Sequence, residues 1–211
     1  MRQHVNPLSR FFQLPLQLPA PEALFRKPDQ PIHLDIGCAR GRCILGLAEL
    51  NQDWNHLGVE IRRPLAISAD RDSIASGQGN VRVLFCNANI SLEDWMKGLP
   101  DDRLRRISIQ FPDPWFKKRH HKRRVIQSSF LDVLARKLVP GGEFHLMTDF
   151  TPIGEDSLEI FEGRPEFENL EGPGKFAKSS TTGIMSEREV THMRRGDPIS
   201  RLHYIHVPIS S

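Results

Sequence analysis

The residues with the clearest chemical meaning lie in one stretch, FPDPWFKKRHHKRR, at positions 111–124. A proline on each side of Asp113 restricts the backbone there, so the direction of its carboxylate is constrained. The basic run KKRHHKRR, residues 117–124, comes directly after Phe116, and such a density of positive charge suits the phosphates of a nucleic acid. The stretch therefore predicts an acid held in position beside a site for a polyanion.

A second group of residues suits a small cofactor that carries positive charge. The segment LDIGCARGR, residues 34–42, reads as a strand, a glycine turn and the start of a helix, which together bring backbone N–H groups close to a ligand. It lacks the GxGxxG of dinucleotide-binding loops. The carboxylate of Asp35, two residues before Gly37, would repel a pyrophosphate but attract an ammonium group, such as that in the methionine moiety of S-adenosylmethionine.

Two more polar residues end predicted strands and fit the rest of that cofactor. Glu60 can accept hydrogen bonds from both hydroxyls of a ribose. Asn87 can bind the edge of an adenine through its amide. In this order along the chain, Asp35, Gly37, Glu60 and Asn87 predict a site for a methyl donor.

Alternating strand and helix patterns predict how these residues are positioned. Strands are expected at residues 31–37, 56–61, 81–88, 104–111, 143–150 and 199–207, and helices at 41–50, 64–77, 91–99 and 123–138. This alternation predicts βαβ units, and hence an α/β fold with a mostly parallel sheet and helices on both faces. Because ligands bind at the carboxyl ends of parallel strands, all the polar residues above are expected on one rim. Beyond Thr151 the pattern is weak until the late strand.

The chain is expected to divide into an arm and a single domain. The first thirty residues are rich in proline, which removes backbone donors too often for regular structure. We refer to residues 1–30 as the arm and expect it to be extended on the surface or mobile. Residues 31–211 are expected to form one domain, since single cores commonly reach about 250 residues.

Composition excludes several classes of protein. The three cysteines, Cys38, Cys43 and Cys86, have no CxxC or Cys/His zinc spacing, which predicts reduced thiols without a disulfide framework or a bound metal. No stretch approaches the roughly 18 apolar residues needed to cross a bilayer. We therefore expect a cytoplasmic protein without membrane anchoring, as a monomer or a homodimer.

Together these motifs closely resemble those of the bacterial tRNA (guanine-N7-)-methyltransferases. The resemblance rests on PDPWFKKRHHKRR, on LDIGCARGR and GVEIRRP upstream and on TDF downstream, and it extends from about Asp35 to Arg201. It implies a Rossmann-like class I methyltransferase fold with a late antiparallel strand. It also implies that S-adenosylmethionine is the cofactor and that the substrate is N7 of the guanosine at position 46, in the variable loop of tRNA.

The resemblance also implies roles for individual residues. Asp35, Glu60 and Asn87 match positions that bind the cofactor. Asp113 matches the catalytic position, in contact with the cofactor or the target base.

Other positions match those that bind the RNA substrate in the family. Lys117 and Asp149 are two of them. A short Thr-x-x-Glu motif that closes over the site corresponds here to Ser186, Glu187, Arg188 and Glu189. Three departures from the family pattern are Ala39 for a loop glycine, Asn87 for aspartate and Ser186 for threonine.

The chemistry of guanine N7 narrows the role of Asp113. This atom has an exposed lone pair and no proton, so a general base is not required. A carboxylate nearby can stabilise the positive charge that develops on the purine. We therefore expect Asp113 or Asp149 to bind guanine's Watson–Crick edge, with Asp113 nearer the methyl group.

Three alternative functions remain open. The motif PDPW superficially resembles the (D/N)PP(Y/F) of methyltransferases that act on exocyclic amines of DNA or on protein amides. A noncatalytic RNA-binding domain with a methyltransferase fold is a second alternative. A nicotinamide oxidoreductase is disfavoured by the missing GxGxxG.

Overall fold

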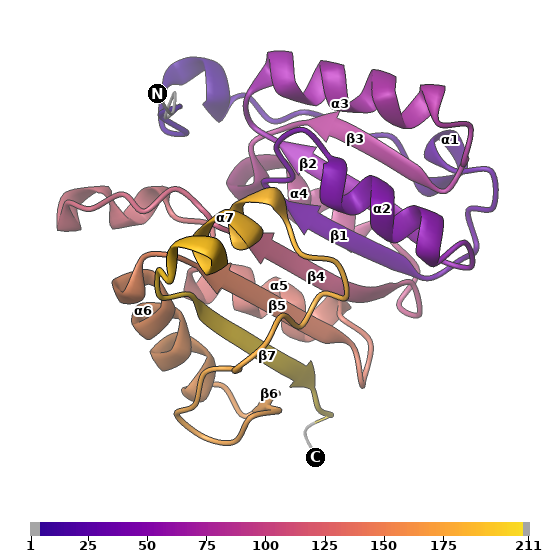
Figure 1. Cartoon of the computed structure of the whole chain (residues 1–211). Coiled ribbons are helices and arrows are strands. Elements are labelled where there is room, and N and C mark those ends of the chain that lie inside the picture. The colour runs from indigo at the N-terminus through magenta and orange to yellow at the C-terminus, as the bar shows by residue number, and fades with distance from the viewer. Residues whose placement is uncertain (1–4, 209–211) are drawn as a thin grey trace.

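A seven-stranded sheet in the order β3-β2-β1-β4-β5-β7-β6 forms the centre of the protein (Figure 1). The computed structural model describes residues 5–208, apart from the side chain at position 118. The strands are β1 (Ile32–Ile36), β2 (Asn55–Glu60), β3 (Val81–Phe85), β4 (Leu104–Gln110), β5 (Glu143–Thr148), β6 (Phe167–Asn169) and β7 (Ser200–His206). Strands β1 to β5 pair in parallel, whereas β7 is antiparallel to both β5 and β6. The predicted mostly parallel sheet with a late antiparallel strand is confirmed.

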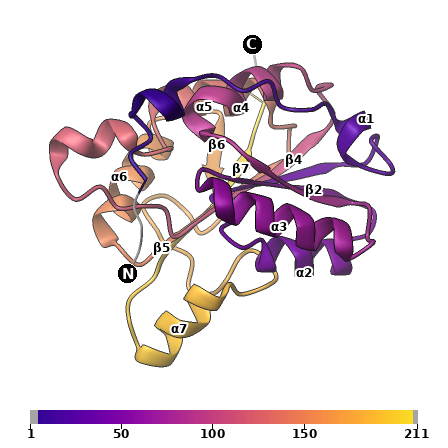
Figure 2. The same ribbon diagram turned by 90° about the horizontal axis from the view of Figure 1, so that it is seen from above.

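Helices cover both faces of this sheet, as predicted. They are α1 (Pro21–Leu24), α2 (Arg42–Leu50), α3 (Arg63–Ala75), α4 (Ala88–Lys97), α5 (Ser128–Lys137), α6 (Thr151–Glu162) and α7 (Glu187–Arg195), with 3-10 turns at Arg10–Gln13 and Lys118–Arg123. Figure 2 shows α2, α3 and α7 on one side of the sheet and α4 and α5 on the other. The side chains of Ile32, Leu34 and Ile36 are buried in the main apolar core.

The neighbouring residues of the same strands are polar, because alternate side chains of a strand point to opposite faces. Ser108 Oγ donates a hydrogen bond to Asp35 Oδ1 at 2.6 Å and lies 2.8 Å from His33 Nε2. His33 Nδ1 lies 3.1 Å from His56 Nδ1. Burial lowers the pKa of both imidazoles, that of His56 to about 4. The two neutral imidazoles and the Ser108 hydroxyl therefore form a hydrogen-bonded row on one face of the sheet, and this row ends at the carboxyl of Asp35.

The predicted helix at residues 123–138 begins later than expected. Helix α5 starts at Ser128, and the basic run before it forms the turn at Lys118–Arg123. Arg124 is extended, and its guanidinium donates to the carbonyl oxygen of Pro114 at 3.1 and 3.2 Å. This tertiary contact outweighs the helical pattern at these positions, so the prediction was wrong there.

Three elements after Thr151 were missed: α6, β6 and α7. Helix α6 carries Gly154 near its start, where a Cβ atom would lie 2.6 Å from Ser200 Cβ, so close packing requires a residue that weakens the helical pattern. Helix α7 buries only Glu189 and so has no apolar stripe. The signal that could have identified it is the Ser-x-x-Glu capping box at its start.

Over its described residues, 5–30, the arm contains only two single helical turns, as its prolines predicted. It does not stand apart from the domain, since Leu24 and Phe25 belong to the main core and Arg26 N donates to Gly79 O at 2.8 Å. The division at residue 30 stays a prediction. Residues 1–4 and 209–211, at the ends of the two predicted spans, lie outside the described residues.

None of the helices in the described part of the chain is long and apolar enough to cross a membrane.

The late elements share one core with the rest of the sheet, which a single substitution can test. Phe161 is fully buried, and its ring stacks on Phe144 and Tyr204 at centroid distances of 4.5 and 4.6 Å. We expect Phe161→Ala to lower the free energy of unfolding by about 3–5 kcal/mol, measured by urea denaturation. The control Ile74→Ala, at a side chain 60% exposed, should change it by less than about 0.5 kcal/mol. A loss below about 1 kcal/mol for Phe161→Ala would contradict a shared core.

Candidate active site

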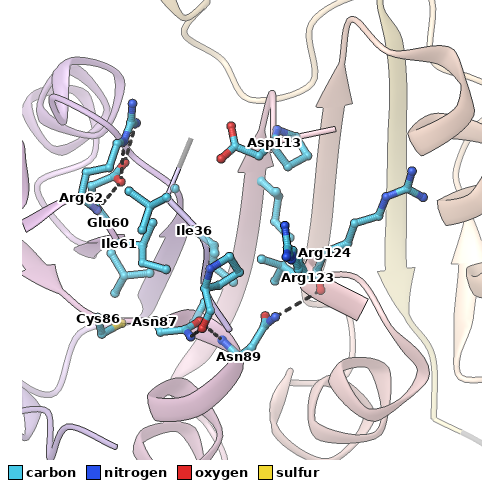
Figure 3. Close-up of a pocket in the computed structure, with 18 of the residues that line it drawn as sticks. Ile36, Glu60, Ile61, Arg62, Cys86, Asn87, Asn89, Asp113, Arg123 and Arg124 are labelled. Atoms are coloured by element: carbon cyan, nitrogen blue, oxygen red, sulfur yellow. Dashed lines mark hydrogen bonds and ion pairs between the residues drawn. The ribbon is translucent and has the colours of Figure 1, made fainter. Parts of the chain in front are cut away.

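Two adjoining hollows lie at the carboxyl ends of β1, β2 and β4. Gly37, Glu60, Asn87 and Asp113 line the first (Figure 3). The residues that line the second include Asp35, Arg42, Asp113, Ser186 and Arg188. Asp113 belongs to both. The fold thus brings the residues expected at the rim to one place, and Asp113 lies where the two hollows meet.

The loop after β1 is held in an unusual conformation. Gly37, Ala39 and Gly41 all have positive φ, at 82°, 52° and 70°. Glycine adopts this conformation without strain, whereas an alanine has a steric cost of about 1–2 kcal/mol. Ala39 N donates to Glu60 Oε2 at 3.0 Å, so the strained residue ties the loop to the end of β2.

Asp35 is buried at the floor of the second hollow. Burial raises the pKa of this carboxyl to about 6; to smaller extents, the hydrogen bond from Ser108 lowers the pKa and the charge of Glu60 raises it. A carboxylate with little access to water gains most from a cationic ligand. Its position and environment fit the predicted contact with an ammonium group.

Glu60 lines the first hollow, and its carboxylate is paired with Arg62; its binding to a ribose stays a prediction. Its Oε1 accepts hydrogen bonds from Arg62 N and Nε at 2.8 and 2.9 Å, and its Oε2 accepts one from Arg62 Nη2 at 2.9 Å. Figure 3 shows this pair across the first hollow from Asp113. The hydrogen bond to Glu60 raises the pKa of Arg62, and the charge of Asp113 adds a smaller effect. A ribose at Glu60 would therefore have to displace the guanidinium, a partner that the sequence did not reveal.

Asn87 is buried, and its side-chain amide makes three hydrogen bonds. Its Nδ2 donates to the carbonyl oxygens of Pro7 and Phe12, both at 3.0 Å, and its Oδ1 accepts from Asn89 N at 3.2 Å. Asn87 thereby caps helix α4 and contacts the arm at the same time. The contact with the arm was not expected, because nothing in the sequence pairs residues this far apart.

The loop that carries Asp113 is strained at both ends. Phe111 and Trp115 have φ angles of 51° and 45°, in the left-handed region that residues with a Cβ rarely adopt,. Phe111 N donates to Met147 O at 2.7 Å, and the Arg124 guanidinium binds Pro114 O. Backbone strain of this kind persists only where surrounding contacts enforce it. Asp113 is thus positioned by the fold as well as by its prolines.

Helix α7 closes one side of the second hollow. Ser186 Oγ accepts from Glu189 N at 3.3 Å, which caps the helix. Glu189 is fully buried and pairs with Arg201 at 2.9 Å. The exposed Glu187 pairs with Arg42. Within the motif, Ser186, Glu187 and Arg188 line the hollow, whereas Glu189 anchors the helix to β7.

Arg188 connects α7 to the Asp113 loop. Its guanidinium pairs with Asp149 and lies 4.8 Å from the ring centroid of Phe111. His192 Nε2 lies 3.1 Å from the same Asp149 carboxylate. Asp149 is therefore engaged by two side chains of α7 and does not line either hollow in this structure. Its binding to guanine stays a prediction.

The basic run divides into two kinds of residue. Lys117, Arg119 and Lys122 are exposed, and Lys117 does not line either hollow. Arg123 instead lies over the ring of Trp115, 4.7 Å from its centroid, and both line the first hollow. Arg124 is mostly buried and pairs with Asp156. Among the described side chains of the run, Lys117, Arg119 and Lys122 are therefore the ones exposed enough to serve as an electrostatic footprint.

One group of metal-ligand residue types occurs within residues 5–208: Glu143, His145 and His203. His145 Nε2 lies 2.8 Å from Glu143 Oε2, and Arg106 Nη2 lies 3.2 Å from the same oxygen. Burial is the main cause that lowers the pKa of His145 to about 4. The carboxylate of Glu143 is already paired with the Arg106 guanidinium, and the ring of His145 stacks on that of His203 at a centroid distance of 4.3 Å. The group therefore reads as a packing contact between β5 and β7, away from the rim.

Comparison with known proteins agrees with this geometry. A family model described as "Putative methyltransferase" matches residues 29–202. Among solved structures, a precorrin-6y C5,15-methyltransferase from Geobacter metallireducens GS-15 has a TM-score of 0.54 at 15% identity, covering 88% of this chain and 86% of that chain. An rRNA methylase from Streptococcus thermophilus has a TM-score of 0.52 at 13% identity, covering 90% and 93%. The fold is that of the class I S-adenosylmethionine-dependent methyltransferases.

Relatives of much higher identity define the family. A tRNA (guanine-N(7)-)-methyltransferase from Parasynechococcus marenigrum (strain WH8102) is 58% identical over 205 residues, covering 97% of this chain and 87% of the relative. A protein of the same name from Trichormus variabilis is 41% identical over 201 residues, covering 95% and 93%. The chain belongs to the tRNA (guanine-N7-)-methyltransferase family. The expected family and its cofactor, S-adenosylmethionine, are confirmed.

The buried position of Asp35 predicts a pH dependence of cofactor binding. Because its pKa is raised from 3.8 to about 6, Asp35 takes up a proton as the pH falls through that value, and the neutral acid no longer attracts an ammonium group. The affinity for S-adenosylhomocysteine should therefore be constant above about pH 7 and fall by up to about tenfold per pH unit below about pH 6. Calorimetry measures this directly.

Asp35→Asn provides the control for that measurement. It should weaken binding near neutral pH and remove most of the pH dependence, since the amide does not titrate. An affinity of the unsubstituted protein that stays constant from about pH 5 to about pH 8 would contradict the assignment.

Proposed function

We propose that this protein transfers the methyl group of S-adenosylmethionine to N7 of a guanosine in tRNA, and that the target lies in the variable loop. The observation that carries the proposal is the position of Asp113, a carboxylate held by a strained loop where two hollows meet. The high identity to relatives named for this activity supports the same conclusion. tRNA is the expected substrate, and the cytoplasm is the expected location of the protein.

The two adjoining hollows suit the two parts of the cofactor. The first hollow, lined by Glu60, Asn87 and apolar residues such as Ile36 and Ile109, suits the adenosine part of the cofactor. Asp35 in the second hollow suits the ammonium group of its methionine part. The cofactor supplies a methyl group activated by a positively charged sulfur. These residues bind and orient it so that the methyl group lies near Asp113.

Asp113 is then able to orient the guanine and stabilise charge. N7 attacks through its own lone pair, so no proton has to be removed. Positive charge moves onto the purine during the transfer, and a fixed carboxylate stabilises it more effectively than mobile water does. Arg124 binds the carbonyl oxygen of Pro114 and Arg188 that of Phe111, and these contacts hold the loop that carries Asp113 in place for this role.

The exposed cations lie beside this rim and suit the tRNA backbone. Lys117, Arg119 and Lys122 are exposed on the turn that follows the Asp113 loop. Ion pairing with phosphate releases counterions and makes binding depend on salt. Trp115, half-buried in the first hollow under Arg123, offers an aromatic face beside the reacting groups.

The role of Asp113 can be tested by substitution. We expect Asp113→Ala to lower the rate of methyl transfer to a tRNA transcript by about 10² or more, because orienting groups contribute at least this much. Asp113→Asn should also be impaired, since it keeps the shape of the side chain but loses the charge. The control is Asp101→Asn, at an acid 88% exposed and paired only with Lys137. Activity of both Asp113 variants within about threefold of the parent would contradict the proposal.

The exposed and the buried cations of the basic run should affect tRNA binding differently. Replacing Lys117, Arg119 and Lys122 together by glutamine should reduce the salt slope of tRNA binding by about 2, since each phosphate contact contributes roughly 0.7 to the slope. Arg124→Gln should leave that slope almost unchanged but lower the methylation rate, because Arg124 holds the Asp113 loop. Filter binding at several salt concentrations measures the slopes. Equal slopes for the parent and the triple variant would exclude these residues from the interface.

A further inference from the structure

The arm is fastened to helix α4 by a regular series of hydrogen bonds. Asn87, Ser91 and Trp95 are spaced four residues apart, so they lie along one face of the helix, and all three are buried. Their partners are main-chain groups of the arm: Asn87 Nδ2 donates to Pro7 O and Phe12 O, Leu16 N donates to Ser91 Oγ at 3.1 Å, and Trp95 Nε1 donates to Pro19 O at 2.8 Å. Figure 2 shows the arm passing over α4. An irregular segment with so many of its backbone groups paired has a defined path.

The first residues of the arm line the first hollow, which we propose holds the adenosine part of the cofactor. Val5 and Pro7 line the same hollow as Glu60 and Asp113, and Pro7 is buried. Gln13 Nε2 donates to Pro7 O at 2.7 Å and so closes a small turn of the arm over this position. The arm is therefore one wall of the hollow.

The chemistry of an amide explains why asparagine suits position 87. Both N–H groups of Asn87 are used by the carbonyl oxygens of the arm. A carboxylate of the same shape has no donors and would face these carbonyl oxygens with like charge. The amide oxygen accepts one hydrogen bond, from Asn89 N, and a carbonyl oxygen can accept two. One acceptor position therefore remains for a ligand in the hollow.

We infer that residues 5–19 are a lid over the cofactor hollow and that Asn87 couples the lid to the cofactor. Its amide nitrogen holds the lid closed, and its amide oxygen accepts a hydrogen bond from the exocyclic amine of adenine. The inference rests on the proposed function, because it takes S-adenosylmethionine as the ligand. Coupling of this kind is reciprocal: the closed arm raises the affinity for the cofactor, and the cofactor protects the arm from opening.

Hydrogen exchange and calorimetry on the full chain test the coupling. In the unsubstituted protein, saturating S-adenosylhomocysteine should slow amide exchange of residues 9–16 at least about fivefold. Asn87→Asp should speed this exchange and weaken S-adenosylhomocysteine binding about tenfold, which corresponds to the loss of two neutral hydrogen bonds. The matched control is Asn89→Asp, which makes the same change on the same helix at a side chain that donates to Arg124 O and not to the arm. It should leave the exchange of the arm in the ligand-free protein unchanged.

A second variant loosens the arm through two residues that do not themselves line the first hollow. Gln13 and Ser91 do not line that hollow, so the double variant Gln13→Ala/Ser91→Ala should weaken binding about threefold only if the arm acts as a lid. Faster exchange of the arm in this variant with unchanged affinity would overturn the lid. Weaker binding in Asn87→Asp with an undisturbed arm would overturn it too and would assign Asn87 to adenine alone. If the unsubstituted protein bound no S-adenosylhomocysteine at all, the proposed function would fail, and the lid with it.

Discussion

The site depends first on the strained conformation of the loop from Phe111 to Trp115. Phe111 and Trp115, one at each end of Pro112-Asp113-Pro114, are both held at positive φ. This conformation is unfavourable for residues with a Cβ atom and persists only where surrounding contacts enforce it. Arg124 holds the loop through the carbonyl of Pro114, and Arg188 packs on the ring of Phe111. The direction of one carboxylate is thus fixed by side chains from two distant segments.

The sheet that carries this loop has one apolar face and one polar face. One face is apolar and buries Leu34 and its neighbours under α4 and α5. The other carries a hydrogen-bonded row of polar groups: the neutral imidazoles of His56 and His33, then the hydroxyl of Ser108, and last the carboxyl of Asp35. A carboxyl at the end of such a row is screened from water and remains ready for a cationic ligand. The same hydrogen bonds that join β2, β1 and β4 on this face therefore also position Asp35 for the cofactor.

The sequence predicted those parts of this arrangement that depend on local pattern. Alternation of strands and helices up to residue 150 was sufficient for the parallel sheet, and the rule of strand ends placed Asp35, Glu60 and Asp113 on one rim. Helix α7 was not predicted, because its polar residues pair with distant residues such as Arg201 on β7 and leave no apolar pattern in the sequence. The contacts of Arg62 with Glu60 and of Asn87 with the arm were equally invisible, since each depends on how the loops fold back over the strand ends and not on local pattern.

The central claim is that one rim brings a methyl donor and a guanosine of tRNA together beside Asp113. The most direct measurement is to incubate the purified protein with unmodified tRNA and S-adenosylmethionine, digest the product and identify the methylated nucleoside and its position by mass spectrometry. The account predicts 7-methylguanosine at a single site in the variable loop. An N6-methylated adenosine, or tRNA left unmethylated by a protein that binds both substrates, would contradict it.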